Sequence, residues 1–455
     1  MSTVKKQSFE MDMTQGPLLR KIILFALPIM FTGMLQLLYN AADVVVIGIF
    51  AGDTSLAAVT STGTFTGLLV NLFLGMATGS GVIIAQAIGS NNREKLHRMV
   101  HTAMSISAII GVLIGVFGFF FSRKMLGLML TPDDVIDLST LYVKIYFLGL
   151  PGQMVYNFGA AIIRSSGDTR RPLIILSLAG IANVLLNLVF VIFLHLDVAG
   201  VAIATITAHY LSAIAIVYIL ITDNADYKLD LSKLKIYKRE LIEVLRYGIP
   251  AGLQTSMFSI SNMLIQSSIN SFGSAVMAGN GAAASIDGFV FVAADSGAQA
   301  SLTFAGQNYG AKKLDRVKKS MFLSMGLSTV MGILAGLIVI LFQRPLLGLF
   351  VDSTEAIEAG MVRLTIMAIL YFSCGIMNSI ANAVRGMGRS VTPMVISMIC
   401  VCAFRVFWVY TVFTKWHTLS SLFVSYPVSY VLAIAAHSIC FIAVFGKEKR
   451  LSQNE

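Results

Sequence analysis

Charged side chains are scarce in this chain of 455 residues, where Asp, Glu, Lys and Arg together make up only 12%. That is about half the share found in typical soluble domains. Hydrophobic residues make up 56%, so an ordinary soluble fold is excluded. The four cysteines all lie in the apolar second half, and their spacing fits neither a disulfide framework nor a metal site. We therefore interpret them as small packing residues.

Several catalytic signatures are also missing. The sequence contains neither HExxH nor GxSxG, so nothing supports an intramembrane metalloprotease or serine hydrolase. It contains no GxxxxGK[ST] loop, which excludes an ATP-driven pump within this chain. We therefore expect a protein that is not an enzyme.

Long apolar runs are what the chain has in abundance. A helix needs about 20 apolar residues to cross a bilayer. Runs of sufficient length lie at about 20–48, 56–88, 97–121, 138–163, 172–194, 199–221, 244–270, 279–308, 316–342, 359–384, 393–414 and 419–445. Several exceed the required length, so tilts or kinks are expected. The predicted fold class is an all-α integral membrane protein with twelve transmembrane helices in two six-helix bundles.

The second half of the chain repeats the first at an almost constant offset of 221 residues. Asn157, Arg164, Gly167 and Pro172 return as Asn378, Arg385, Gly388 and Pro393, while Pro28 and Asn40 return as Pro250 and Asn262 at offset 222. Six spans per copy make the copies parallel repeats, an arrangement typical of transporters with a substrate site between the copies. A channel would need a filter-like loop, which is not seen. We expect an N-terminal lobe over 1–221, a cytoplasmic linker over 222–243 and a C-terminal lobe over 244–455.

Basic residues predict the orientation, because cytoplasmic loops are enriched in Lys and Arg. With the N-terminus inside, 26 of the 33 basic residues fall on the cytoplasmic side. Six fall outside, and these are Arg123, Lys124, Lys144, Arg344, Arg363 and Lys415. The formal net charge of +10 is thus a topology signal, and we expect no nucleic-acid partner. Residues 1–19 have no apolar core, so no cleavable signal peptide is expected. The predicted location is the plasma membrane, multi-pass, with both termini cytoplasmic.

One acid lies deep in the first copy. Burying an ionisable group in a membrane costs about 2.5–3.5 kcal/mol or more, so such groups are functional candidates. Asp43 follows Gln36, Tyr39 and Asn40 at helical spacing, which gives these polar residues a shared helix face. A carboxyl group there is suited to taking up and releasing a proton or a small cation. The alternative is a water-exposed acid near the outer mouth.

Polar groups at comparable depth lie on two later spans. Asn183 and Asn187 are one turn apart, and Thr205 lies on the following span. Taken alone, such residues more often form hydrogen bonds between membrane helices than ligand sites.

The second copy carries its own polar residues. Asp295 and Gln299 form an i, i+4 stripe through an apolar helix, Asp287 lies nearer the outer end, and Asn262 is the counterpart of Asn40. Arg405 is the only base that we place at mid-depth. Because an unpaired buried charge is very costly, we expect Arg405 to pair with Asp295 or Asp287. The alternative is that Arg405 binds an anionic group of a substrate.

Four short motifs stand out along the chain. They are Tyr39-Asn40-x-x-Asp43 with Gly48, Gln86-x-x-Gly89, Arg164-x-x-Gly167-Asp168-Thr169 with Pro172, and Gly200-x-x-x-Ala204-Thr205. Together these motifs resemble those of the multidrug and toxic compound extrusion (MATE) family of bacterial transporters. The resemblance covers essentially the whole chain. It implies export of organic cations and related amphiphiles in exchange for Na⁺ or H⁺, with no cofactor beyond the coupling ion. It also implies a coupling site formed by Asp43, Asn183, position 187 and Thr205.

Position 187 departs from the family pattern, since Asn stands where many members have Asp. An amide dipole cannot replace the attraction of a second carboxylate for Na⁺, so we expect H⁺ to drive transport rather than Na⁺. Alternatively, coupling has moved to the polar stripe of the second copy. The expected partners are a small organic cation or amphiphile and membrane lipids, and the expected state is a monomer. Within the same superfamily, the alternative function is a flippase for a lipid-linked oligosaccharide.

Overall fold

The computed structural model describes residues 10–129 and 131–454, and their regular secondary structure is entirely helical. The first nine residues of the polar N-terminal segment lie outside the described part. The long elements of the first half are α1 (Leu18–Phe50), α2 (Gly52–Gly89), α3 (Arg93–Leu128), α4 (Ile136–Leu148), α5 (Leu150–Ser165), α6 (Arg170–Leu188) with η1 (Val189–Phe193), and α7 (Asp197–Thr222). The second half has α8 (Lys238–Asn270), α9 (Ser274–Gly310), α10 (Leu314–Leu341), the short α11 (Gln343–Leu347), α12 (Thr354–Gly386), α13 (Val391–Ser397), η3 (Met398–Ala403), α14 (Phe404–Trp408), η4 (Val409–Phe413) and α15 (Leu419–Asn454).

These elements form twelve membrane-spanning segments, as the sequence predicts. In the described residues, ten helices are long and apolar enough to cross a bilayer by length and composition. The remaining two segments differ for local reasons. The segment made of α4 and α5 is interrupted at Gly149, just before Pro151, whose ring removes a backbone N–H donor. The other, α8, carries Ser, Gln and Asn side chains along its length, which lowers its hydropathy.

The chain divides into two compact units. Unit 1 comprises residues up to 66 and 83–242, and unit 2 comprises 67–82 and 243–455. The middle of α2 belongs to unit 2 because its glycines lie against glycines of α8. A Cβ added to Gly75 would lie 2.0 Å from the Gly252 nitrogen, and one added to Gly79 would lie 2.5 Å from the Gly248 nitrogen. Only glycine permits this close helix packing. The lobe boundaries expected from the sequence stay a prediction.

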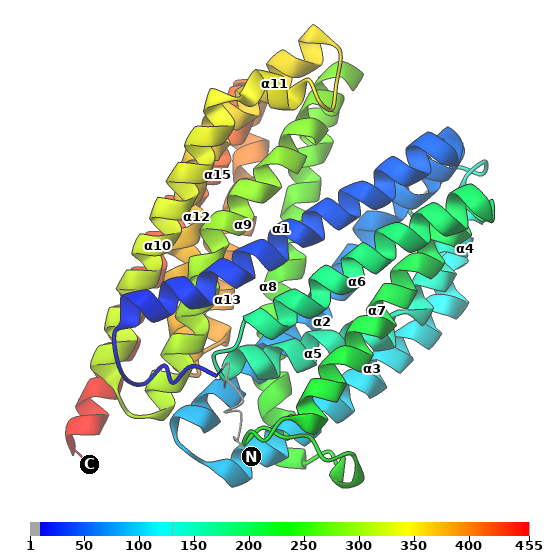
Figure 1. Cartoon of the computed structure of the whole chain (residues 1–455). Coiled ribbons are helices and arrows are strands. Elements are labelled where there is room, and N and C mark those ends of the chain that lie inside the picture. The colour runs from blue at the N-terminus through cyan, green and yellow to red at the C-terminus, as the bar shows by residue number, and fades with distance from the viewer. Residues whose placement is uncertain (1–9, 130, 455) are drawn as a thin grey trace. The chain divides into compact units, whose positions relative to one another are not determined.

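In unit 1, α1 packs on α6 and α7, while α3 packs on α4 and α5 (Figure 1). Large buried side chains such as Phe147 and Phe158 fill the interior. The exposed residues are also apolar, including Phe120, Ile214 and Tyr218. A soluble protein would not leave so many large apolar side chains uncovered, whereas lipid tails cover them in a bilayer.

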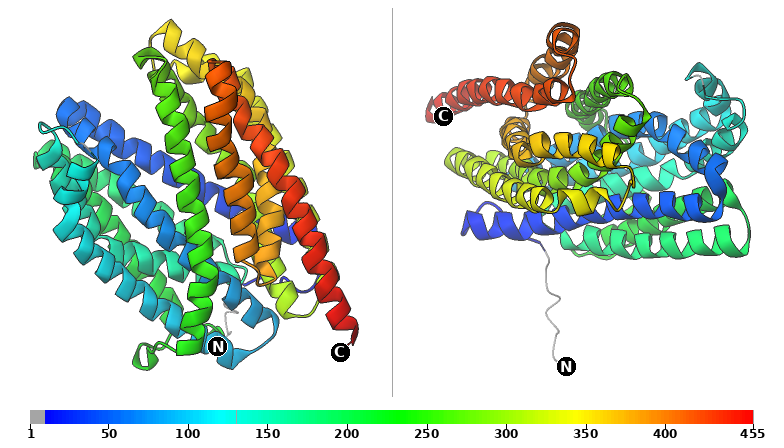
Figure 2. Two further views of the ribbon diagram at one scale, coloured as in Figure 1. Left: turned by 180° about the vertical axis from the view of Figure 1, so that it is seen from behind. Right: turned by 90° about the horizontal axis from the view of Figure 1, so that it is seen from above.

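In unit 2, α12 is the central helix and contacts α9, α10 and α15. Figure 2 shows α15, in red, running beside the orange segment that contains α14. Small residues permit the approach of α9, α10 and α12, since a Cβ on Gly297 would lie 2.5 Å from the Ser328 hydroxyl and one on Gly375 would lie 2.9 Å from the Ser328 Cβ. Such contacts are typical of membrane helices, where packing replaces the hydrophobic effect.

Two corresponding helices contain π-helical turns. In the first half, η1 follows α6 directly, so Asn187 lies in the last turn before it. In the second half, η3 and η4 flank α14, so Arg405 lies in a single α-helical turn between two π-helical ones. Such π-turns are rare and frequently occur at functional sites. Both helices are therefore distorted next to a buried polar residue that the sequence singles out.

The segment after α7, which the sequence predicts to be a linker, packs on unit 1. Arg171 donates to the Asp223 carboxylate (2.5 Å) and to the Tyr227 hydroxyl (2.9 Å), and Tyr227 in turn donates to Asp223 (2.8 Å). Tyr227 is buried. Farther along, the Asp230 backbone N–H donates to His101 Nε2 at 3.1 Å. This part of the chain is thus held by side chains of α3 and α6 and is not an unstructured tether.

Candidate functional site

Three helices of unit 1 bring four predicted residues together. Asp43 lies on α1, Asn183 and Asn187 on α6, and Thr205 on α7. Asn187 Nδ2 donates to Asp43 Oδ1 at 2.5 Å and lies 3.4 Å from Asn183 Oδ1. Asn183 Nδ2 lies 3.5 Å from the Thr205 hydroxyl oxygen, and Thr205 is also a hydrogen-bonding neighbour of Asp43. We call these residues the Asp43 cluster.

The partners of Asp43 are all neutral. Among residues 10–129 and 131–454, no Lys or Arg pairs with this carboxyl group. Asn187 is fully buried, Asn183 is nearly so, and Asp43 and Thr205 are half-buried. The Asp43 cluster therefore presents one carboxyl group to a surrounding of amides and a hydroxyl.

The side-chain oxygen of Asn187 is an unused hydrogen-bond acceptor. Its nitrogen faces Asp43, while Oδ1 is buried and has no hydrogen-bond partner among the described residues. Leaving a buried acceptor unsatisfied costs about 1–3 kcal/mol. A turned amide would offer that oxygen to a protonated Asp43, because a carboxylic acid can donate one O–H bond. The same two side chains thus have a suitable geometry for either protonation state.

The other residues of the predicted α1 face differ in their surroundings. Tyr39 donates to the Ser177 carbonyl at 3.1 Å, and its ring lies so close to Gly180 that a Cβ there would be 1.9 Å from Tyr39 Cε2. Tyr39 therefore anchors α1 on α6. Gln36 and Asn40 are exposed, so the structure does not bring them into the Asp43 cluster.

In unit 2, the predicted pairing of Arg405 with Asp287 is wrong. Arg363 on α12 donates to Asp287 Oδ2 at 2.7 Å and to Asn280 Oδ1 at 2.8 Å. Arg363 was expected to face the outer side, because it lies near the start of the predicted span 359–384, where a long basic side chain can reach water. The helix begins earlier, at Thr354, and Arg363 is largely buried against Asp287 instead.

The predicted pairing of Arg405 with Asp295 is also wrong. Asp295 Oδ2 accepts from Gln299 Nε2 and Oδ1 accepts from Asn378 Nδ2, both at 2.9 Å. The first contact is the i, i+4 neighbour that the sequence indicates. The second crosses from α9 to α12. Two amide donors thus stabilise this carboxyl group, and no described Lys or Arg forms a salt bridge with it.

Arg405 itself is surrounded by neutral groups. Its Nε donates to the Ser429 hydroxyl at 3.1 Å, and its Nη1 donates to Asn262 Oδ1 at 3.2 Å. The guanidinium carbon lies 3.9 Å from the centre of the Tyr426 ring and 5.1 Å from that of Tyr430. Only 3% of Arg405 is exposed. This buried cation is thus stabilised by cation–π contacts.

Similarity to known proteins shows the family to which this chain belongs. The MatE family model matches residues 28–189 and again residues 250–411. The chain belongs to the MatE family. The two matches have equal length and are offset by 222 residues (250 − 28 and 411 − 189), so the family model also matches both copies of the internal repeat.

This MatE protein is similar to a probable multidrug resistance protein and to a named transporter. It is 27% identical over 424 residues to the probable multidrug resistance protein YoeA of Bacillus subtilis, with 91% of each chain covered. It is 24% identical over 390 residues to the FAD transporter of Shewanella oneidensis, with 84% of this chain and 85% of that one covered. The solved structure of an outward-facing multidrug resistance MATE family transporter of the MOP superfamily matches with a TM-score of 0.91 at 19% identity, covering 98% and 100% of the two chains. The MatE protein is thus a multi-pass membrane transporter of a kind that exports small compounds.

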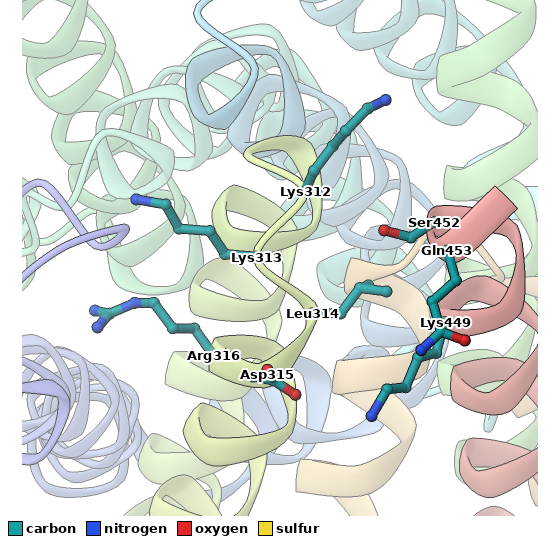
Figure 3. Close-up of a pocket in the computed structure, with 8 residues that line it drawn as sticks. All are labelled: Lys312, Lys313, Leu314, Asp315, Arg316, Lys449, Ser452 and Gln453. Carbon is teal, nitrogen blue, oxygen red and sulfur yellow. The ribbon is translucent and has the colours of Figure 1, made fainter. Parts of the chain in front are cut away.

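A basic pocket lies apart from these interior residues. It has a volume of about 350 Å³ and is lined by Lys312, Lys313, Arg316 and Lys449 together with Asp315. Figure 3 shows that Lys313 and Arg316 extend to one side while Lys449 lies on the other. Because the cations do not converge on one point, we do not include this pocket in the candidate site.

Three groups that contact the buried charged residues of the MatE protein were not predicted from the sequence. They are Arg363 beside Asp287, Asn378 beside Asp295, and the tyrosines Tyr426 and Tyr430 around Arg405. One signal was available for Arg363. Because α9 and α12 are separated by one antiparallel spanning helix, they run in the same direction, and both Asp287 and Arg363 lie in the first half of their helix. Nothing in the sequence pattern indicates the tyrosine contacts.

Proposed function

We propose that this MatE protein is a secondary antiporter that exports organic cations or amphiphiles in exchange for H⁺, with Asp43 as the coupling carboxyl group. The observation that carries this proposal is the neutral surrounding of Asp43, whose partners are Asn187 and Thr205. A group held by neutral partners can be ionised or protonated without breaking an ion pair. Na⁺ would find only one carboxylate, whereas hard cations favour sites with several charged or carbonyl oxygen ligands.

Exchange follows from competition for a single negative charge. Ionised Asp43 attracts a cationic substrate, while protonated Asp43 does not. If proton and substrate are bound alternately, uptake of one favours release of the other, which is the differential affinity that a coupled transporter requires. The Asn187 amide supports both states, because it donates to the carboxylate as it stands and a turned amide would offer Oδ1 to the acid.

The proposed setting is the plasma membrane, with both termini on the cytoplasmic side and the two copies alternating between inward and outward access. The distribution of Lys and Arg supports this orientation. Parallel six-helix repeats support alternating access, since transporters of this architecture move one repeat against the other around a central site. We propose that one chain carries out the cycle alone.

Transport of ethidium into everted vesicles, which corresponds to export from the cell, tests the coupling. Ethidium is added outside vesicles that contain the protein, and its accumulation is followed under either a pH gradient or a Na⁺ gradient, with and without a protonophore. We expect wild-type transport to follow the pH gradient and Asp43→Asn to abolish it. The matched control is Asp134→Asn, which removes an exposed acid of the same unit and should leave transport intact. Normal proton-driven efflux by Asp43→Asn at equal protein level would refute the assignment, and strict Na⁺ dependence at constant pH would refute H⁺ coupling.

A further inference from the structure

Arg405 is a buried positive charge in unit 2 without a negatively charged partner among the described residues. Asp287 has Arg363 as its partner, and Asp295 is held by the amides of Gln299 and Asn378. In the described residues, no acid pairs with Arg405, which is almost completely buried. Burying a charge without a counter-charge is expensive. A buried cation of this kind is therefore a candidate binding group for an anion.

The orientation of the guanidinium group is fixed by its neighbours. Nε is held by the Ser429 hydroxyl, one hydrogen of Nη1 is held by Asn262, and the Tyr426 ring packs 3.9 Å from the guanidinium carbon. Tyr430 is a further hydrogen-bonding neighbour of the guanidinium group. Nη2 has no acceptor among the described residues although it is buried. Nη2 is thus the unpartnered arm of a guanidinium group, and guanidinium groups bind the oxygens of carboxylates and phosphates well.

The residues that hold Arg405 add selectivity for an amphiphile. Neutral acceptors such as Ser429 and Asn262 orient the guanidinium without cancelling its charge, unlike the Asp287 carboxylate at Arg363. The two tyrosines supply flat apolar surface next to that charge. An oxyanion attached to an aromatic or aliphatic body matches this combination, whereas a small hydrated anion gains little from the rings.

We propose that Arg405, with Tyr426 and Tyr430, forms a binding site in unit 2 for the carboxylate or phosphate group of an exported amphiphile. This inference rests on the proposed function, because it specifies one class of compound that the transporter carries. It adds to the cation-binding role of the Asp43 cluster a separate site of opposite charge. Substrates that bear an anionic group would be bound through Arg405 and not through Asp43.

Two probes of equal shape and opposite charge test the site. Calorimetry on the purified full chain in detergent measures binding of 2-naphthoate and of 2-naphthylmethylammonium. We expect Arg405→Gln to weaken 2-naphthoate binding by about tenfold or more, to leave the ammonium probe unaffected, and Arg405→Lys to retain part of the affinity. The control Arg344→Gln removes an exposed arginine of the same unit and should change neither probe. Replacing 2-naphthoate by 2-naphthyl phosphate distinguishes a carboxylate site from a phosphate site.

The outcomes separate this inference from the coupling proposal. If wild-type protein does not bind either anionic probe at millimolar concentration, or if Arg405→Gln binds them as tightly as wild type does, the inference is wrong. Should Arg405→Gln fail to fold, Arg405→Lys and the preference of wild type between the matched probes still decide the matter. The assay needs no ion gradient. Asp43→Asn should therefore bind 2-naphthoate normally even where it has lost ethidium efflux.

Discussion

Replacing Arg363 by Met removes the base from the buried ion pair in unit 2. Asp287 is 1% exposed, so the carboxylate left behind has no access to water. The substitution loses the 2.7 Å contact to Asp287 and the 2.8 Å contact to Asn280. Breaking a buried pair by removing one partner costs about 3–5 kcal/mol. With roughly 2–4 °C lost per kcal/mol in a unit of this size, we expect the melting temperature in detergent to fall by roughly 6–20 °C.

A second variant identifies the cause of that loss. In the double variant Arg363→Met with Asp287→Asn, no uncompensated charge remains, so most of the lost stability should return. Arg405→Met serves as the comparison, because no acid pairs with Arg405 in the part of the chain that the structure describes. Its combination with Asp287→Asn should therefore regain nothing. Thermal melts of the single and double variants measure both effects. Strictly additive losses for Arg363 and Asp287 would show that the reasoning about the pair is wrong.

The remaining predictions concern the Asp43 cluster, the contact between α1 and α6, and the segment after α7. Asn187→Asp supplies a second carboxylate, so ethidium efflux should become stimulated by a Na⁺ gradient, and efflux that stays indifferent to Na⁺ would contradict this. Gly180→Val drives a side chain into the Tyr39 ring and should cost about 1–3 kcal/mol of stability, much of which Tyr39→Ala should restore in a melting experiment. Although burial opposes it, hydrogen bonds from Arg171 and Tyr227 and the charge of Arg171 hold the pKa of Asp223 below its usual value. Its stabilising effect is thus fully present above about pH 4 and is lost only as the pH falls through the lowered value. Hydrogen exchange of amides 224–237, corrected for intrinsic rates, should accordingly be the same from pH 5 to pH 8 and faster in Asp223→Asn at every pH.

The sequence was sufficient for the architecture because membrane constraints act locally. Each span needs a run of apolar residues, and a repeated unit leaves a fixed offset, here matched by the family model at 28–189 and 250–411. Helical periodicity also indicated correctly that Asp295 and Gln299 share a face. The resemblance to a known family then grouped Asp43 with Asn183, Asn187 and Thr205, which lie on three different helices.

Tertiary structure decided which groups meet across helices. Asp287 and Arg363 are 76 residues apart, and their contact depends on the relative depth of α9 and α12, which no local pattern encodes. Arg363 lies near the start of the predicted span 359–384, and its position there did not reveal that it is buried against Asp287. From the sequence alone, Tyr39 could equally have faced a polar cavity. Because Gly180 on α6 has no side chain, the Tyr39 ring can pack directly against that helix. Arg405 was predicted to need an acid, yet tyrosines supply its stabilisation. Local sequence thus fixes spans and faces, whereas helix depth and packing select the partners.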